Sequence, residues 1–337
     1  RLLPQEVIAM GQDLLVLNEV YKHFPLRVGF WQKTIKKVHA VDGVDLRLRR
    51  GEVLGVVGET GCGKSTLAQL IMGIYPTTAG SISLNGQDIS TIRKSRKVKR
   101  CVQMVFQDPF WSLNPRKTVR KILAEPFKVH RIASGKELNG RIENLFSMVG
   151  LEPERLDSFP HEFAGGERQL VGIARSIALQ PELVILDEPT SAIDTFSQAV
   201  ILNLLLELRN KFNLSYILIS HDLSVVHYLA DRIAVMYLGK IVETGKVEDV
   251  FNSPCHPYTK ALLRAIPVID PDGKVKPIEP IKGDIPSAID PKPGCRFAGR
   301  CPEVLSICSL EDPSNMEVGE KHFAACHLFK NSSFRSS

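Results

Sequence analysis

The sequence predicts an α/β fold in which helices cover a largely parallel sheet. Three short apolar runs are typical of strands buried on both faces, at residues 53–57, 183–186 and 216–219. Residues 167–179 and 198–212 place apolar side chains at the spacing of amphipathic helices. Strand–helix–strand alternation of this kind yields parallel strands, because each crossover helix packs back onto the sheet.

The composition indicates a globular protein that does not itself enter a membrane. The 337 residues suffice for one large domain with an appendage, or for two ordinary domains. Apolar residues make up 44% and charged residues 24%, a balance found in soluble proteins. No stretch approaches the ~18 apolar residues of a spanning helix, and residues 1–10 lack the cleavage site of a signal peptide.

Residues 14–57 form short apolar or alternating runs separated by turn residues. Alternation with period two over residues 44–48 predicts a strand with one face exposed to water. Further along, residues 121–150 predict a largely helical region. The basic run at residues 93–100 lacks interleaved aromatic residues, so we interpret it as a solvated face and expect no nucleic-acid binding.

A glycine-rich loop follows the first buried strand and precedes a helix predicted over residues 64–75. It reads Gly58-Glu59-Thr60-Gly61-Cys62-Gly63-Lys64-Ser65, a complete G-x-x-x-x-G-K-S motif. Glycines let backbone N–H groups converge on phosphate oxygens, and the helix N-terminus adds a positive field. Lys64 can reach the β- and γ-phosphates, and the Ser65 hydroxyl can ligate Mg²⁺. The motif therefore predicts a nucleoside triphosphate site, with a simple glycine turn as the alternative.

The buried run at residues 183–186 ends in two carboxylates, Asp187 and Glu188. They lie at the carboxyl edge of the predicted sheet, where such folds bind ligands. Asp187 is placed to hold Mg²⁺ through water, and Glu188 to orient and polarise an attacking water. Alone this pattern is weak, but after the phosphate loop it predicts triphosphate hydrolysis.

Four further segments identify a family. They are Phe106-Gln107-Asp108-Pro109, Phe163-Ala164-Gly165-Gly166-Glu167-Arg168-Gln169, Ser191-Ala192-Ile193-Asp194 and Ile219-Ser220-His221-Asp222. They resemble the Q-loop, signature, D-loop and switch-histidine segment of ABC ATPases, in the family's order, and the likeness covers at least residues 14–245. It implies a P-loop NTPase with a mixed-sheet core, an antiparallel β subdomain and a helical signature subdomain at about residues 108–180.

The resemblance also implies a head-to-tail dimer of ATPase domains with two ATP molecules sandwiched between them. In it Glu188, His221, Gln107 and Lys64 are the expected catalytic residues, and Ser65, Gln107 and Asp187 hold Mg²⁺. Gln107 would also link Mg²⁺ to a transmembrane subunit. The expected ATP-binding residues are Phe24, Gly58, Thr60, Gly61, Cys62, Gly63, Lys64, Ser65, Thr66, Gln107, Ala164, Gly165, Gly166, Glu167, Asp187 and Asp194.

Two residues of the signature depart from the family pattern. Ala164 stands where the family prefers Ser, and Glu167 where it prefers Gln. Loss of the hydroxyl removes one hydrogen bond to the γ-phosphate, worth about 1 kcal/mol. For stacking on adenine, alignment favours Phe24, with Tyr21 as the alternative and a core position open to either.

Cysteines crowd the C-terminal part of the chain. Seven cysteines without an export signal argue against a disulfide framework. Cys295, Cys301, Cys308 and Cys326 form the pattern C-x5-C-x6-C-x17-C, which suits a soft metal or an iron–sulfur cluster. The absence of C-x2-C argues against a zinc ribbon, and four unliganded thiols are the alternative.

The cysteine pattern resembles the C-terminal domain of oligopeptide/dipeptide permease ATPases, which implies a four-iron, four-sulfur (4Fe-4S) cluster. Residues 112–116 and 256–259 resemble segments of the same subfamily, and the first favours its second (F-type) ATPase subunit. We therefore expect an ABC ATPase domain over residues 12–250, a helical and proline-rich linker over residues 251–293, and an iron–sulfur lobe over residues 294–330.

The expected function is to energise an ABC importer of dipeptides or oligopeptides by ATP hydrolysis. Importers of oligosaccharides or nickel in the same family, and a soluble non-transport ABC ATPase, are the alternatives. The expected partners are a homologous ATPase subunit in a heterodimer, two transmembrane permease subunits and, indirectly, an extracellular solute-binding protein. The chain would then lie peripherally on the cytoplasmic face of the cell (inner) membrane.

Overall fold

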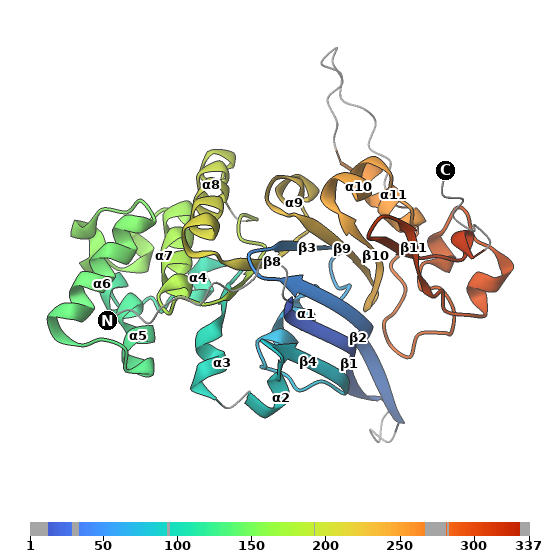
Figure 1. The fold of residues 1–337 in the computed structure, drawn as a ribbon, viewed down its shortest axis with the longest axis horizontal. Coiled ribbons are helices and arrows are strands. Elements are labelled where there is room, and N and C mark those ends of the chain that lie inside the picture. The colour runs from blue at the N-terminus through green and yellow to red at the C-terminus, as the bar shows by residue number, and fades with distance from the viewer. Residues whose placement is uncertain are drawn as a thin grey trace, which may run out of the picture. The chain divides into compact units, whose positions relative to one another are not determined.

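The computed structural model describes residues 13–28, 34–92, 95–191, 193–266, 281 and 283–330 (Figure 1). The chain divides into two compact units made of interleaved stretches. The first unit comprises Arg1–Val16, Leu46–Val53 and Ile82–Ile217, and the second comprises Leu17–Asp45, Leu54–Ser81 and Leu218–Ser337. The domain boundaries expected at residues 250 and 293 remain predictions, and residues 267–280 of the expected linker lie outside the described part.

The described residues form helices and strands in alternation. The strands are β1 (Asp13–Val28), β2 (Thr34–Arg49), β3 (Val53–Val57), β4 (Ala79–Leu84), β5 (Gln87–Asp88), β6 (Val102–Val105), β7 (Leu183–Asp187), β8 (Ser215–Ser220), β9 (Arg232–Tyr237), β10 (Lys240–Lys246), β11 (Asn315–Gly319) and β12 (His322–Ala325). The helices are α1 (Lys64–Ile71), α2 (Ile89–Ile92), α3 (Arg96–Cys101), α4 (Pro109–Ser112), α5 (Val119–His130), α6 (Gly135–Met148), α7 (Gly165–Ile177), α8 (Thr195–Phe212), α9 (Leu223–Leu229), α10 (Val247–Asn252) and α11 (Pro257–Arg264).

The first unit combines a parallel strand pair with most of the helices. β6 and β7 run parallel, and every residue of β7 is buried, as its uninterrupted apolar run predicts. The helical region expected over residues 121–150 is two helices, because the chain reverses at Arg131, whose φ of +55° ends α5. Ile122, Phe146 and Val171, one from each of α5, α6 and α7, are at most 3% exposed.

The second unit contains a mixed sheet with the strand order β11-β12-β10-β9-β3-β8. β3 and β9 are parallel, whereas β9, β10 and β12 follow one another in antiparallel pairs. The helix after the phosphate loop ends at Ile71 rather than at residue 75, and Gly73 follows with a φ of +68°. A smaller sheet of order β2-β1-β4-β5 includes the antiparallel pair β4–β5, and β1, β2 and β4 contribute residues to both units.

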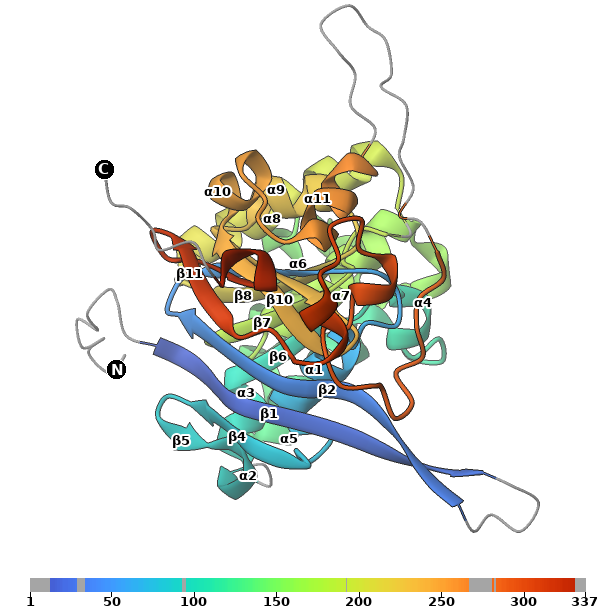
Figure 2. The same ribbon diagram turned by 90° about the vertical axis from the view of Figure 1, so that its right-hand side faces the viewer.

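The C-terminal cysteine segment is joined to the sheet of the second unit. β12 pairs with β10 through Glu243 opposite Ala324 and Thr244 opposite Phe323, and β11 pairs with β12. Figures 1 and 2 show the C-terminal strands beside β10 from two directions. The small lobe expected over residues 294–330 stays a prediction as a separate domain. Its two strands extend an existing sheet, which provides backbone hydrogen-bond partners that so short a segment lacks by itself.

Among the described helices, none combines the length and the hydrophobicity needed to cross a lipid bilayer.

Candidate functional site

The phosphate loop of the second unit depends on its glycines. Gly58, Gly61 and Gly63 have φ values of +151°, +84° and +113°, which side-chain-bearing residues rarely adopt. A Cβ at Gly58 would lie 2.1 Å from the Met236 carbonyl oxygen, and one at Gly63 would lie 2.1 Å from that of Ala40. A Cβ at Gly61 would meet nothing within 4 Å. Two glycines therefore let the loop pack against β9 and β2, and the third faces open space.

Lys64 begins α1 and turns its ammonium back over the loop. Its Nζ donates to the carbonyl oxygens of Gly58 at 2.6 Å and Glu59 at 3.0 Å, and lies 3.6 Å from Cys62 Sγ. Lys64 is only 6% exposed, so it presents a fixed charge at the helix N-terminus. Among the other residues expected to bind ATP, Thr60 and Ser65 are exposed and Thr66 is half-buried. Burial raises the pKa of the Cys62 thiol, which is therefore protonated at neutral pH.

The two candidates for adenine stacking lie on β1. Phe24 is half-buried and meets Tyr75 edge to face, with ring centroids 5.3 Å apart. Lys22 Nζ lies 4.9 Å from the centroid of the Phe24 ring. Tyr21 lies against Gly43, where an added Cβ would be 3.0 Å from the Tyr21 hydroxyl. The assignment of Phe24 stays a prediction.

His221 belongs to the second unit and is exposed just after β8. The next residue, Asp222, caps α9 by accepting a hydrogen bond from the Ser224 amide at 2.8 Å. The cap fixes the turn between β8 and α9, and the exposed His221 lies in that turn. Its contact with a γ-phosphate stays a prediction.

In the first unit the structure brings two predicted catalytic residues together. Gln107 Nε2 donates to Glu188 Oε2 at 2.7 Å. Glu188 has a φ of +46°, and its carbonyl oxygen accepts hydrogen bonds from the amide and hydroxyl of Ser191. Asp187, the last residue of β7, is 9% exposed. A glutamate in this unusual backbone conformation directly after a buried strand is typical of a functional position.

The signature segment starts α7, with Ala164 as its N-cap. Glu167 Oε2 accepts a hydrogen bond from the Ala164 amide at 2.9 Å, and the same carboxylate pairs with Arg155. The Arg155 guanidinium holds the pKa of Glu167 below its usual value. The departure from Gln at this position thus has a structural consequence, because an ionised side chain caps the helix and binds an arginine.

Gly166 and Asp194 meet at Ser197 on α8. A Cβ at Gly166 would lie 2.8 Å from Ser197 Cβ, so this glycine is required for packing within its own chain. Asp194 caps α8 by accepting from the Ser197 amide at 2.9 Å, and these hydrogen bonds lower its pKa. The D-loop aspartate therefore shapes the segment beside the signature, and its contact with ATP stays a prediction.

The four C-terminal cysteines lie near one another, and no disulfide joins any of them. The Cys295 amide donates to the Cys308 carbonyl at 2.8 Å, and a Cβ at Gly294 would lie 2.5 Å from that oxygen. Burial raises the pKa of Cys295, Cys301 and Cys326, the last to about 11, and neighbouring cysteine sulfurs add to each shift. In the described chain, no three of these sulfur atoms lie within 4.8 Å of one another.

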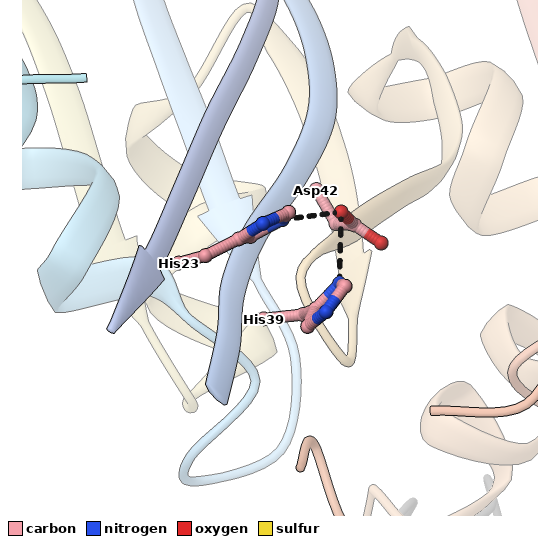
Figure 3. A group of neighbouring side chains, drawn as sticks. All are labelled: His23, His39 and Asp42. Carbon is pink, nitrogen blue, oxygen red and sulfur yellow. Dashed lines mark hydrogen bonds and ion pairs between the residues drawn. The ribbon is translucent and has the colours of Figure 1, made fainter. Parts of the chain in front are cut away.

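A second cluster, which the sequence analysis missed, surrounds Asp42 on β2 (Figure 3). Asp42 Oδ1 lies 2.8 Å from His23 Nε2 and 3.2 Å from His39 Nδ1, and the two rings stack with centroids 3.8 Å apart. Asp42 Oδ2 pairs with Arg296. Burial opposes ionisation, but His23 and Arg296 outweigh it and hold the pKa of Asp42 below its usual value. These residues have metal-ligand chemistry, yet the arginine already supplies the balancing cation.

A third group is centred on Glu243 of β10, which is 1% exposed. Its carboxylate accepts hydrogen bonds from the amides of Cys255 and His256, and lies 2.7 Å from His322 Nε2. The carboxylate therefore has a partner on each oxygen and serves to join β10, the start of α11 and β12. No local sequence signal marks either complete group, because one partner in each lies far along the chain: Arg296 is 254 positions from Asp42, and His322 is 79 positions from Glu243.

Comparison with known proteins agrees with these features. A family described as "ABC transporter" matches residues 41–191, and one described as "Oligopeptide/dipeptide transporter, C-terminal region" matches residues 242–308. The oligopeptide transport ATP-binding protein AppF of Bacillus subtilis is 48% identical over 325 residues, covering 95% of this chain and 99% of its own. The dipeptide transport ATP-binding protein DppF of Escherichia coli is 43% identical over 314 residues, covering 92% and 93%.

Solved structures show the same fold. The subunit cbiO1 of Clostridium perfringens, part of an ABC transporter complex, has a TM-score of 0.61 and 28% identity, covering 72% of this chain and 91% of its own. The ATP-binding cassette MJ0796, solved as a dimer bound to ADP and phosphate, has a TM-score of 0.61 and 26% identity, covering 69% and 98%.

A glycine loop holding a buried lysine, a buried strand ending in Asp-Glu and a helix opened by a glycine pair together define an ABC-type ATPase. Within that class, the chain belongs to the family of ATP-binding proteins of oligopeptide and dipeptide ABC transporters.

Proposed function

We propose that this chain hydrolyses ATP to energise an ABC importer of dipeptides or oligopeptides. One observation carries the proposal. Relatives named as oligopeptide or dipeptide transport ATP-binding proteins match the chain over more than nine-tenths of both lengths. Its expected partners are two transmembrane permease subunits and, indirectly, an extracellular solute-binding protein. The chain would lie on the cytoplasmic face of the membrane, held there by the permease.

The predicted catalytic and Mg²⁺-binding residues each have a role in this function. The loop glycines and Lys64 bind the phosphates, while Ser65 and Asp187 hold Mg²⁺ with Gln107. Glu188 orients and polarises the attacking water, and His221 contacts the γ-phosphate. The hydrogen bond from Gln107 to Glu188 supports this assignment, because it ties the proposed base to the residue that reports the state of the permease. Phe106 and Phe110, which are 43% and 53% exposed beside Gln107, offer an apolar surface for that permease.

We further propose that ATP is sandwiched between this chain and a homologous ATPase subunit. The start of α7 presents Ala164 to solvent, and the N-terminus of a helix favours a negatively charged ligand. Phe196, at the start of α8, is 80% exposed. An exposed aromatic residue beside the D-loop is suited to a protein interface.

The four cysteines are proposed to hold a 4Fe-4S cluster. A tetrahedral zinc site with Zn–S bonds of about 2.3 Å brings its sulfurs to about 3.8 Å from one another. No three of the four described sulfurs lie within 4.8 Å of one another, and an iron–sulfur cluster accommodates more widely spaced thiolates because its body lies between them. Cys295, Cys301, Cys308 and Cys326 would supply the thiolates, and the cluster would join four separate chain segments into one fold.

The test uses the full transporter in proteoliposomes, with Glu188→Gln as the diagnostic variant. Wild-type ATPase should rise when a peptide-loaded binding protein is added, and should not rise with sugar- or nickel-binding proteins. Glu188→Gln keeps the shape of the side chain but cannot accept a proton. It should therefore bind Mg–ATP normally and lose about 10²–10⁴-fold in turnover and uptake. Stimulation by sugar or nickel instead of peptide, or full turnover by Glu188→Gln, would contradict the assignment.

A further inference from the structure

Two arginines lie between the first two clustered cysteines, in the segment from Cys295 to Cys301, named here the arginine loop. Arg300 precedes Cys301 and makes a two-pronged ion pair with Glu59, with Nη1 2.7 Å from Oε2 and Nη2 3.1 Å from Oε1. The Arg300 side chain is 5% exposed and that of Glu59 is 21% exposed. Glu59 is the second residue of the phosphate loop, so one ion pair joins the cysteine segment to the nucleotide site.

Glu59 is held from several directions. Its amide donates to the Tyr258 hydroxyl at 2.8 Å, and its carbonyl accepts from Lys64 Nζ at 3.0 Å. Tyr258 is fully buried and packs on Phe297 of the arginine loop, with ring centroids 5.4 Å apart. The arginine loop therefore determines both the position of the Glu59 carboxylate and the packing of the tyrosine that binds its amide.

The second arginine anchors the same loop to β2. Arg296 pairs with Asp42, which His23 and His39 also contact (Figure 3). The Asp42 amide donates to the Gly239 carbonyl at 2.8 Å, and the Gly239 amide donates to the Cys62 carbonyl at 2.8 Å. Thus a short chain of hydrogen bonds leads from Arg296 to the far side of the phosphate loop.

We propose that the arginine loop positions the phosphate loop for ATP, with Arg300 acting through Glu59 and Arg296 acting through Asp42. Neither arginine has to touch ATP. The two hydrogen bonds of the bidentate pair between Arg300 and the poorly exposed Glu59 carboxylate fix the loop before the nucleotide arrives, so less ordering remains to be done on binding. A dependence of ATP affinity on the iron–sulfur cluster also follows, and this part rests on the proposed function of the cysteines.

The experiment measures Mg–ATP affinity of the purified full-length chain, and KM and kcat of the transporter. Arg300→Met and Glu59→Gln should each raise the Kd and KM for ATP about tenfold, with kcat little changed. The double variant should be no worse than either single variant, because both remove the same ion pair. Arg300→Lys, which keeps the charge but not the fork, should restore affinity in part.

Lys240→Met provides the matched control. It breaks the ion pair between Lys240 and Asp312, at 2.6 Å, which joins β10 to the C-terminal segment outside the arginine loop. It should leave the Kd for ATP unchanged. Unaltered ATP affinity in Arg300→Met, or strictly additive effects of Arg300→Met and Glu59→Gln, would overturn the proposal.

Iron content separates this proposal from that of the cluster. Each variant is assayed for iron and acid-labile sulfide alongside the nucleotide titration. If wild-type protein holds no iron while Arg300→Met still weakens ATP binding, the cluster is refuted and the positioning role stands. If iron is present and ATP affinity ignores Arg300→Met, the positioning role is refuted and the cluster stands.

Discussion

Cys308 shows how closely the cysteine segment is folded around its four thiols. Its carbonyl accepts the Cys295 amide, and the positive φ of Gly294, +96°, allows the chain to pass that same oxygen. Neither feature requires a metal to form, yet both fix the first and third cysteines relative to each other.

Cys308→Ser should lower iron and sulfide to near zero in protein purified without oxygen, because a hydroxyl is a poor ligand for iron. Yield of folded protein should fall more than the ATPase activity of the surviving fraction, since the cluster is expected to act as a structural link. Cys255→Ser, at a half-buried cysteine outside the group, is the control and should keep full iron. Stoichiometric zinc without iron, in cells supplied with iron, would exclude the cluster.

Glu167 illustrates what residue patterns could and could not predict. The signature around it helped to identify the family although Glu167 itself departs from the family pattern, and the family assignment is confirmed. Pattern matching also placed it among ATP-binding residues, which stays a prediction, and it gave no sign that the carboxylate caps α7 and pairs with Arg155. Arg155 lies twelve residues before Glu167, in a segment that carries no sequence motif. Only the folded chain therefore reveals this contact.

At the scale of elements, α11 depends on an unusual cap. His256 Nδ1 accepts a hydrogen bond from the Tyr258 amide at 3.1 Å, and the ring is 1% exposed. Nε2 therefore carries the proton, and in the described residues it has no hydrogen-bond partner. Burial lowers the pKa of His256 to about 4, with Lys260 adding to the shift and Glu243 opposing it.

This cap predicts a loss of stability in mild acid. Between about pH 4 and 6.5 the unfolded chain binds a proton at His256 that the folded chain excludes, so stability falls as the pH falls. The contribution is complete above pH 6.5 and amounts to about 3 kcal/mol when fully lost. The free energy of unfolding in urea should be measured for wild type and for His256→Asn, which keeps an acceptor at the cap. The wild-type value should rise relative to that of the variant as the pH is raised from 4.5 to 7.5. Parallel profiles would show that His256 is not the group responsible.

Strands were predicted correctly where a single run of apolar residues determines the strand. β3, β7 and β8 were predicted from uninterrupted apolar runs, since burial on both faces leaves a signal in the run itself. β11 and β12 carry no such run. They form because β10 offers a strand edge about eighty residues before β12, and because Glu243 and His322 contact each other, 79 positions apart. Pairing between strands that are so far apart along the chain leaves no periodic pattern in the sequence of either strand.

At the scale of the whole assembly, the proposed sandwich requires that the signature of this chain serve the ATP held by its partner. Gly166 is unsuited to the test, because a side chain there would collide with Ser197 in its own chain. Ala164 is exposed at the N-cap, where Asp and Asn are both favourable for the helix. Substitution there changes the surface offered to a partner without removing a packing contact.

Ala164→Asp should leave Mg–ATP binding to the isolated chain unchanged and should reduce the ATPase of the assembled transporter by at least about tenfold. The added carboxylate would face the γ-phosphate held by the partner, and like charges in contact are costly. Ala164→Asn, which caps the helix without a charge, should retain most activity. Lys64→Ala should instead weaken binding to the isolated chain. If Ala164→Asp weakened that binding as severely as Lys64→Ala, the sandwich would be wrong.

Arrangement at this scale could be predicted only in part. Motif order and spacing predicted the ABC fold and the family, because each motif is contiguous. The contact between Arg300 and Glu59 could not be predicted, since the two residues are 241 positions apart and each is unremarkable alone. The same holds for Arg296 and Asp42, 254 positions apart.

The pairing of β12 with β10 also bears on aggregation. An uncovered β10 would present a row of free amides and carbonyls to any passing strand, the usual starting point of edge-to-edge association. With β12 in place the outermost strand becomes β11, which is five residues long, irregular between Glu317 and Gly319, and exposed at Glu317. A short, bulged edge with a charged side chain is a poor template for a further strand. By covering the edge of β10, the cysteine segment thus also protects the sheet of the second unit from edge-to-edge pairing with other strands.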